Sequence, residues 1–297
     1  MIRIGLVDFD TSHCVAFTQR LNHIDIAADQ WVNGGKVVAG WPGDSAMMPE
    51  RIPGYAEQMR GYGVPLVERM EDLFGRIDAV MINSQQGSRH PGRARPFIEA
   101  GVPTFIDKPF ASSARDADAM IALATELGTP LMSSSALRYA PEVREALRRE
   151  TELGRIIAAD VWGSATLHDG NPGLRNYGVH GVEILYTLMG AGCREVSQAS
   201  TLGADIVTGL WTGGRLGVLR GVREGQGGFG FTAHYEKGHY SAVVQGAAFY
   251  SELMKVVVEM FTTRIAPIAL SETREITAFM DAAEQSSMRR GAITPLS

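Results

Sequence analysis

The chain has 297 residues and a net charge of −5 at neutral pH, with 45% hydrophobic and 21% charged residues. This length suits about two domains, whose cores need no disulfide bridges. The acidic balance, without a basic stripe, argues against a nucleic-acid-binding protein. No signal peptide opens the sequence, and charges interrupt its most apolar stretch, 253–270. We therefore expect a cytoplasmic protein with no nucleic-acid or membrane partner.

Strand-like and helix-like stretches alternate over the first 133 residues, which predicts a doubly wound parallel sheet with helices on both faces. Residues 40–53 are rich in Gly and Pro and are expected to form a loop. The expected strands are 2–7, 36–39, 79–83, 104–106 and 130–133. The expected helices are 15–28, 67–74, 93–100 and 113–128.

The pattern changes after residue 133, where short β-like runs are separated by glycine turns. We predict an α+β domain over 134–297 with a mixed, largely antiparallel sheet. The expected strands there are 156–161, 205–211, 215–223, 230–236 and 240–244. The expected helices are 140–152, 178–189, 249–262 and 271–289.

Lys108 follows the fourth expected strand, inside the tripeptide Asp107-Lys108-Pro109. In a doubly wound sheet, ligands bind at the carboxyl ends of the strands. A proline disfavours the helical conformation in the residue before it, so Lys108 is expected to be extended and aimed into the crevice. A surface lysine beside a turn is the alternative interpretation.

Asn176, His180 and Glu183 lie at the start of an expected helix, four and then three residues apart. If the helix begins near Asn176, all three share one face. Histidine is the side chain best suited to proton transfer near neutral pH, and Glu183 is placed to orient or charge it. A histidine simply packed on a helix is the alternative.

In order and spacing, these motifs resemble the Gfo/Idh/MocA oxidoreductase family over nearly the whole chain. Residues 107–109 match the Glu-Lys-Pro strand end of that family, and 176–183 match its Asp-x-Gly-x-His-x-x-Asp motif. Residues 84–90 resemble the loop after the third strand, with His90 in the family's histidine position. Residues 138–141 resemble the segment that opens the second domain.

The resemblance implies a Rossmann-like dinucleotide-binding domain at 1–133, an NAD or NADP cofactor, and a substrate-binding and oligomerisation domain at 134–297. Lys108 and His180 would line a sugar or polyol site, with His180 as general base and Lys108 holding the reacting oxygen. Asn176 and Arg138 would position neighbouring hydroxyls, and Glu183 would support His180. A mixed sheet with one apolar face needs a cover, so we expect a homodimer or homotetramer.

The glycine-rich turn of the family falls on residues 8–13, where Asp8, Asp10 and His13 replace the glycines. A carboxylate about 5 Å from a phosphate charge costs roughly 3 kcal/mol at an effective dielectric of about 20. Three interpretations stay open. Asp10, Thr11 or Ser12 caps the helix in place of the phosphate; a shifted loop still binds the dinucleotide through backbone amides, with Asp10 touching a sugar hydroxyl; or Asp8, Asp10 and His13 bind a metal.

The second expected strand lacks the acidic end that normally grips the adenosine ribose, although Asp44 is near and Trp41 is placed to stack on adenine or fill its pocket. Asn176 also replaces an aspartate and cannot accept a proton. A non-redox family member is therefore the alternative: a sugar-binding or regulatory protein, or a lyase, isomerase or hydrolase. We predict no metal site, and the predicted cofactor-binding residues are Asp8, Asp10, Thr11, Ser12, His13, Trp41, Ser84, His90, Asp107 and Lys108.

Overall fold

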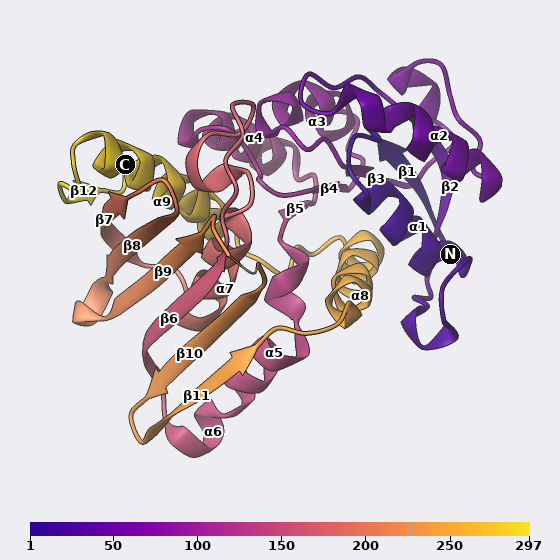
Figure 1. Ribbon diagram of the computed structural model, residues 1–297. Coiled ribbons are helices and arrows are strands. Elements are labelled where there is room, and N and C mark those ends of the chain that lie inside the picture. Colours follow the sequence, from indigo (N-terminus) through magenta and orange to yellow (C-terminus); the bar gives the residue numbers. More distant parts are fainter. Residues whose placement is uncertain (226) are drawn as a thin grey trace. The chain divides into compact units, whose positions relative to one another are not determined.

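A computed structural model describes residues 1–225 and 227–297, and the chain divides into two compact units (Figure 1). The first unit comprises Met1–Ala111, Arg115–Ser134 and Tyr250–Leu270. The second unit comprises Ser112–Ala114, Ser135–Phe249 and Ser271–Ser297. The chain therefore crosses between the units several times, whereas the sequence pattern predicted a single boundary after residue 133.

A five-stranded sheet with the order β2-β1-β3-β4-β5 forms the centre of the first unit. Every neighbouring pair in it is parallel. Its inner strands are buried along most of their length, as expected for apolar strands covered on both faces. The strands are β1 (Ile2–Val7), β2 (Gly35–Trp41), β3 (Ala79–Ile82), β4 (Thr104–Ile106) and β5 (Leu131–Ser133). The predicted doubly wound parallel sheet is confirmed.

One further bridge extends this sheet beyond β2. Leu66 pairs in parallel with Gly40, whose N–H donates to the Pro65 carbonyl at 3.0 Å. Counting this bridge as a short outer strand gives the order 3-2-1-4-5-6 of the dinucleotide-binding Rossmann fold, which reverses between β1 and β3. The prediction of a helix over 67–74 is wrong except for a 3-10 turn at Met70–Leu73, because Leu66, just before this segment, is paired to Gly40 of β2.

Helices flank the parallel sheet in Figure 1. The structure adds α2, which starts in the last two residues of the expected loop 40–53 and was not predicted; Pro53 in its first turn is compatible with a helix start. The helices are α1 (His13–Asn22), α2 (Ile52–Gly61), α3 (His90–Glu99) and α4 (Ala114–Leu127).

Helix α8 (Ala248–Thr263) packs on the first unit, although the sequence analysis included it in the second domain. Val258 leaves so little room that a Cβ on Gly34 would lie 2.9 Å from it. The Ser251 hydroxyl donates to the Gln30 carbonyl at 2.8 Å. The apolar side of α8 therefore packs against β2 and the loop before it, which lie more than 200 residues earlier in the chain.

The second unit holds a seven-stranded sheet with the order β11-β10-β6-β9-β8-β7-β12. The β6–β9 pair is parallel and the other pairs are antiparallel, which confirms the predicted mixed, largely antiparallel sheet. The strands are β6 (Ile156–Ser164), β7 (Cys193–Ser200), β8 (Ala204–Trp211), β9 (Leu216–Val222), β10 (Phe229–Tyr235), β11 (Gly238–Val243) and β12 (Thr294–Pro295).

Helices bury one face of this second sheet. They are α5 (Pro141–Arg148), α6 (Glu150–Leu153), α7 (Val179–Met189) and α9 (Leu270–Met288). Tyr186 of α7, Trp211 of β8 and Phe279 of α9 share one core through ring contacts. Across the sheet, alternate side chains such as Trp162 and Leu216 are exposed.

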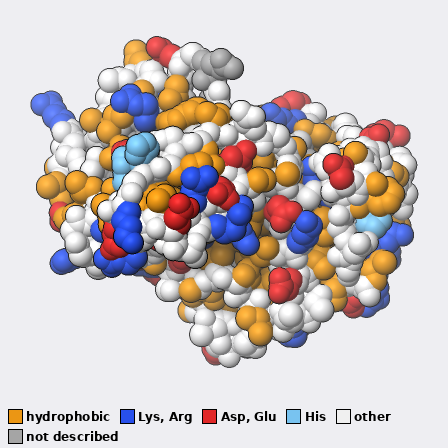
Figure 2. Space-filling model, turned by 90° about the horizontal axis from the view of Figure 1, so that it is seen from below, with side chains coloured by type: hydrophobic (Ala, Val, Ile, Leu, Met, Phe, Trp, Pro, Cys, Tyr) orange, Lys and Arg blue, Asp and Glu red, His pale blue; other side chains and the backbone are white. Residues whose placement is uncertain are grey.

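The surface mixes charges of both signs. Figure 2 shows acidic and basic side chains interspersed with hydrophobic ones over the face in view. Within the described ranges, no helix combines the length and the apolar character that crossing a membrane requires.

Candidate functional site

Asp8 lies directly after β1, at the point where the strand order of the first sheet reverses. Its φ of 64° is left-handed, a conformation that Asp tolerates better than most residues. Its Oδ2 accepts hydrogen bonds from Arg93 Nε at 3.0 Å and from the Ser84 hydroxyl. Burial raises the pKa of Asp8 to about 6, against the opposing influence of Arg93. The paired guanidinium offsets the charge repulsion expected for an isolated carboxylate at this position.

Arg93 extends this ion pair toward the end of β2. Its second nitrogen donates to Asp44, which also accepts from Arg89 at 2.5 Å. These hydrogen bonds, with that from Arg93 the stronger, hold the pKa of Asp44 below its ordinary value. The Arg93 guanidinium also lies 4.5 Å from the centre of the Trp41 ring. We call Asp8, Arg93, Asp44 and Arg89 the Asp–Arg cluster. Its Arg93 covers one face of Trp41, the side chain predicted to contact adenine.

Asp10 connects two loops and does not cap α1. Its Oδ2 accepts from the Ser45 hydroxyl at 2.7 Å, and its Oδ1 accepts from the Gln85 N–H at 3.0 Å. Ser12 precedes α1 but makes no side-chain capping bond. Thr11 Oγ1 accepts from the His13 N–H at a long 3.4 Å. Of the three residues expected to cap the helix, Asp10 and Ser12 do not, and only Thr11 accepts a hydrogen bond from an N–H at the helix start.

His13 ties the start of α1 to the end of β4. Its Nδ1 lies 2.5 Å from Asp107 Oδ2, and its ring packs against Phe17 and Tyr250. Burial alone would raise the pKa of Asp107, but His13 and Lys108 keep it below its usual value. Since Asp8, Asp10 and His13 each have separate partners, they do not converge. Across the described residues, no group of three or more His, Cys, Asp or Glu side chains is arranged to hold a metal ion.

His90 is fully buried and linked to protein on both sides of its ring. Its Nε2 lies 2.8 Å from the Ser84 carbonyl and its Nδ1 lies 3.1 Å from the Phe110 carbonyl. Burial lowers its pKa. His90 therefore joins the loop after β3 to the segment after β4, and both nitrogens expected to be available for a cofactor are engaged. Ser84 likewise uses its hydroxyl on Asp8.

Asn83 is a further candidate, which was not predicted from the sequence. It follows β3 beside the end of β1, where its N–H donates to the Val7 carbonyl at 2.9 Å. The side chain is buried, and neither of its amide atoms has a hydrogen-bond partner within the part of the chain that the structure describes. A polar residue immediately after an apolar strand at the switch point was the available signal. Together with the start of α1 and the neutralised Asp8, this amide is compatible with a dinucleotide.

Lys108 directly follows Asp107 at the end of β4. Its own N–H donates to Asp107 Oδ1 at 2.8 Å, and its side chain is largely buried. The peptide bond from Lys108 to Pro109 is cis. The carboxyl edge of the first sheet therefore carries this lysine, as predicted from the strand pattern.

In the second unit, α7 begins at Val179, so Asn176 lies outside the helix. The expectation that Asn176, His180 and Glu183 share one helical face is therefore wrong for Asn176. Its Nδ2 donates to the Thr166 carbonyl at 2.9 Å, while its Oδ1 is buried with no partner among the described residues. His180 is at the start of α7, and its Nδ1 lies 2.6 Å from Ser135 Oγ.

Glu183 pairs with Arg138, a residue expected to contact substrate directly. Its Oε2 accepts from Arg138 Nε at 2.9 Å, and Arg138 Nη1 lies 2.7 Å from Glu272 Oε1. Burial raises the pKa of Glu183, although Arg138 opposes that shift. Both carboxylates contact the guanidinium, so Arg138 links α7 to α9 through buried ion pairs. We call Arg138, Glu183 and Glu272 the Arg138 clamp.

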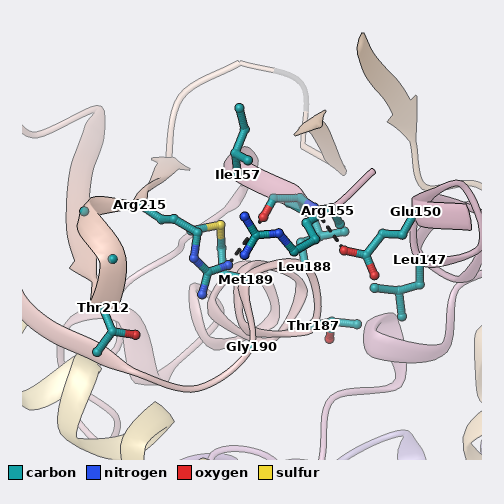
Figure 3. Close-up of a pocket in the computed structure, with 13 residues that line it drawn as sticks. Leu147, Glu150, Arg155, Ile157, Thr187, Leu188, Met189, Gly190, Thr212 and Arg215 are labelled. Carbon is teal, nitrogen blue, oxygen red and sulfur yellow. Dashed lines mark hydrogen bonds between the residues drawn. The ribbon is translucent and has the colours of Figure 1, made fainter. Parts of the chain in front are cut away.

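A separate hollow of about 870 Å³ lies in the second unit beside the end of α7. Figure 3 shows the Arg155 and Arg215 side chains converging there near Gly190. Arg155 Nε donates to Glu236 at 3.1 Å and Arg215 Nη1 to the Ile156 carbonyl at 3.4 Å. The lining includes no residue predicted from the sequence to act in catalysis or binding.

Comparisons with known proteins connect these features to a family. Residues 47–135 match the sequence model of the Gfo/Idh/MocA family, described as "Oxidoreductase family, NAD-binding Rossmann fold". The protein named "Putative oxidoreductase YceM" of Salmonella typhimurium is 32% identical over 129 residues, which are 43% of this chain. The match spans 40% of the length of YceM.

Solved structures share the whole fold at low sequence identity. Myo-inositol dehydrogenase from Lactobacillus casei, in complex with NAD(H) and myo-inositol, has a TM-score of 0.80 at 13% identity, covering 100% of this chain and 97% of that one. Myo-inositol dehydrogenase from Corynebacterium glutamicum has a TM-score of 0.81 at 14% identity, covering 100% and 99%. An oxidoreductase from Agrobacterium radiobacter, in complex with NAD+, L-tartaric acid and magnesium, has a TM-score of 0.80 at 13% identity, covering 99% and 98%.

Proposed function

Because residues 47–135 of this chain match the Gfo/Idh/MocA family of oxidoreductases, we propose that it is an NAD- or NADP-dependent dehydrogenase acting on a CH–OH group of a sugar, polyol or sugar acid. The main support is that Lys108 ends β4 of a Rossmann sheet and His180 starts α7, each with its neighbours fixed by hydrogen bonds. A fold-sharing dehydrogenase in complex with NAD(H) and myo-inositol adds the substrate class.

The bound dinucleotide supplies the hydride acceptor. His180 takes the proton of the reacting hydroxyl as general base, and Lys108 holds that oxygen as negative charge develops on it. Asn176 accepts a hydrogen bond from a neighbouring hydroxyl through Oδ1, because Thr166 holds its Nδ2. Glu183 and Arg138 support the site without themselves binding substrate.

The cofactor would be held by the start of α1 with Thr11 and Ser12, and by the Asn83 amide. Trp41 and Asp44 would contact the adenosine end. Asp8 and Asp10 shape the loop around the diphosphate through their bonds to Arg93 and Gln85. His13, Ser84, His90 and Asp107 hold the surrounding segments in place.

Thermal unfolding with NAD+, NADH, NADP+ and NADPH tests cofactor binding, after extraction of any nucleotide that co-purifies. A ligand at about a hundred times its dissociation constant stabilises the folded state by about 2.7 kcal/mol. We expect a clear rise in the unfolding temperature with one nucleotide pair. No shift and no extracted nucleotide would contradict the proposal.

Turnover tests the catalytic assignment. With NAD+ or NADP+ and myo-inositol as the first probe, we expect NADH or NADPH to form steadily. Lys108→Met should abolish this turnover while the unfolding temperature stays close to that of the parent, and the exposed Lys36→Met is the matched control. Full residual activity in Lys108→Met would refute the role of Lys108.

The alternative is a family member without redox turnover, either a sugar-binding or regulatory protein or a lyase, isomerase or hydrolase. It is favoured by the Asp–Arg cluster in place of the glycine turn and by Asn176 in place of an aspartate. Steady reduction of NAD+ or NADP+ by any polyol would rule it out. Sugar binding in the absence of nucleotide, without turnover, would support it.

We also propose a homodimer or homotetramer joined through the open face of the second sheet, where Trp162 and Leu216 are exposed. A monomeric mass in light scattering would contradict this assembly. Both cysteines are free and buried, in keeping with the proposed cytoplasmic location, because reducing compartments keep thiols unpaired.

A further inference from the structure

The hollow beside the end of α7 has the size and the lining of a small-molecule site. Its volume of about 870 Å³ lies within the range of ligand pockets, which are mainly apolar with a few placed polar groups. The apolar lining residues are Leu147, Ile156, Ile157, Leu188 and Met189. None of the lining residues is assigned to the proposed dehydrogenase site, so a ligand in this hollow is a second one.

Arg215 brings a positive charge to the hollow from the turn before β9. Along β9, Gly217 and Leu219 contact α7, whereas Leu216 is exposed on the opposite side of the sheet. Because side chains alternate along a strand, Arg215 belongs to the helix side. Figure 3 shows its guanidinium near Gly190, at the end of α7.

The charge of Arg215 is not matched by a carboxylate. Within the part of the chain that the structure describes, its guanidinium forms no ion pair, and its Nη1 donates to the Ile156 carbonyl at a long 3.4 Å. A guanidinium carries five N–H donors in a planar fork, which matches the two oxygens of a carboxylate. Arg215 therefore keeps donors for an anion in the hollow.

Arg155, at the start of β6, supplies a second guanidinium. Its Nε and Nη2 each lie 3.1 Å from Glu236 Oε1, and its side chain is 83% exposed. An exposed pair of this kind is weak, so Arg155 can turn toward a ligand at little cost. Glu150 also lines the hollow, but its Oε1 accepts the Ile156 N–H at 3.0 Å. Two arginines and one glutamate leave the lining with an excess of one positive charge.

We propose that this hollow binds a small organic carboxylate. The two oxygens of the carboxylate meet the fork of Arg215, Arg155 adds the second positive charge, and the hydrocarbon part lies on the apolar lining. The turn between β8 and β9 leaves room at the rim, since a Cβ on Gly213 or Gly214 would meet nothing within 4 Å. The site lies within the second unit and does not depend on the proposed dehydrogenase activity.

Titration of protein labelled with 15N-arginine tests the site, with hexanoate as the probe and NMR of the arginine Nε–H signals as the readout. Arg215→Lys and Arg155→Lys assign the two signals. We expect both to shift and to saturate with a dissociation constant of about 1 mM, because the probe is small. On the same parent protein, 1-hexanol should leave them in place, since it has the same chain without the charge. Shifts that do not saturate, or equal shifts with 1-hexanol, would overturn the proposal.

Arg215→Gln tests whether the fork of Arg215 holds the anion. Followed through the Arg155 signal, hexanoate should bind at least about tenfold more weakly, because a bidentate charged hydrogen bond is lost. Arg155→Gln should cost only about threefold, because Glu236 already shares its charge. Arg220→Gln, at an exposed position of β9 outside the hollow, is the matched control and should leave binding unchanged. Equal binding by Arg215→Gln and the control would refute the site and leave Arg215 with a role only at the C-terminal end of α7.

Inorganic phosphate distinguishes the two common kinds of anion. We expect it to bind at least about tenfold more weakly than hexanoate, because burial of about two CH₂ groups is worth that factor and phosphate has none. Phosphate that binds as tightly as hexanoate would overturn the assignment to a carboxylate. These titrations contain no nicotinamide nucleotide, so their outcome is independent of whether the proposed dehydrogenase activity is found.

Discussion

Each unit of the molecule contains buried arginine and carboxylate groups in contact, but the two clusters differ in their access to solvent. In the first unit, Arg93 joins Asp8, whose side chain is 1% exposed, to Asp44, whose side chain is 63% exposed. In the second unit, Arg138 joins Glu183 and Glu272, at 5% and 20%. The Asp–Arg cluster thus has an open, solvent-exposed end at Asp44, whereas both carboxylates that pair with Arg138 are largely buried.

The largest expected effect is on the stability of the second unit, when the Glu183 carboxylate is removed from the Arg138 clamp. Glu183→Ala leaves the buried Arg138 with Glu272 as its remaining carboxylate, and we expect a loss of about 3 kcal/mol in unfolding free energy. Urea unfolding measures it, and Glu183→Gln, which keeps the shape, should lose less. A loss below about 1 kcal/mol for Glu183→Ala would show that the Arg138 clamp is no tighter than a surface pair.

The pH dependence of Asp8 gives the next effect. Its folded pKa of about 6 exceeds the ordinary 3.8, so the folded state binds its proton more tightly. Its contribution to stability is therefore full below about pH 4 and is lost as pH rises through 6, by about 3 kcal/mol.

Asp8→Asn removes this titration and tolerates the left-handed backbone. We expect the unfolding free energy of Asp8→Asn minus that of the parent to rise between pH 4 and pH 7.5. Urea unfolding over this range measures the difference, in which the other titrating groups cancel. A difference that stays flat would mean that Arg93 keeps Asp8 ionised throughout.

Gly43→Ala tests how tightly the loop after β2 fits Asp8. A Cβ on Gly43 would lie 1.7 Å from Asp8 Oδ1, and its φ of 69° is left-handed. Gly63 has a φ of 72° with nothing within 4 Å of its Cβ position. Thermal unfolding should show a loss of about 1 kcal/mol for Gly63→Ala and a clearly larger loss for Gly43→Ala. Equal losses would indicate that the loop moves freely away from Asp8.

Asp44→Ala should have the smallest effect on stability, below about 1 kcal/mol, because its carboxylate is exposed. Its removal frees Arg89 and Arg93 to meet an added phosphate, so binding of NADP+ should gain relative to NAD+. Calorimetric titration with both nucleotides measures the ratio. An unchanged ratio would place the adenosine ribose away from the open end of the Asp–Arg cluster.

The sequence pattern was enough to predict the type of both sheets, because apolar runs and glycine turns are local signals, but it did not predict β7 or β12 of the second sheet. The predicted strand at 104–106 coincides with β4 (Thr104–Ile106). Side-chain pairing was not predictable in the same way. Glu183 is three residues from His180 yet pairs with Arg138, 45 residues away, and Asp8 pairs with Arg93, 85 residues away. A charged side chain pairs with the opposite charge that the fold brings nearest. Helical spacing alone does not identify that partner.

Helix α8 has a consequence for how the protein is made. The ribosome releases Ala248–Thr263 only after Ser135–Phe249 of the second unit has been synthesised, yet this helix covers Gly34 of the first unit, and its Val258 fills the space beside that glycine. During synthesis, the apolar surface of the first unit beside Gly34 therefore stays exposed until the chain has grown past residue 263. A stop codon after the last strand of the first sheet would leave the fragment without this helix, so the short product should depend on chaperones far more than the full chain does.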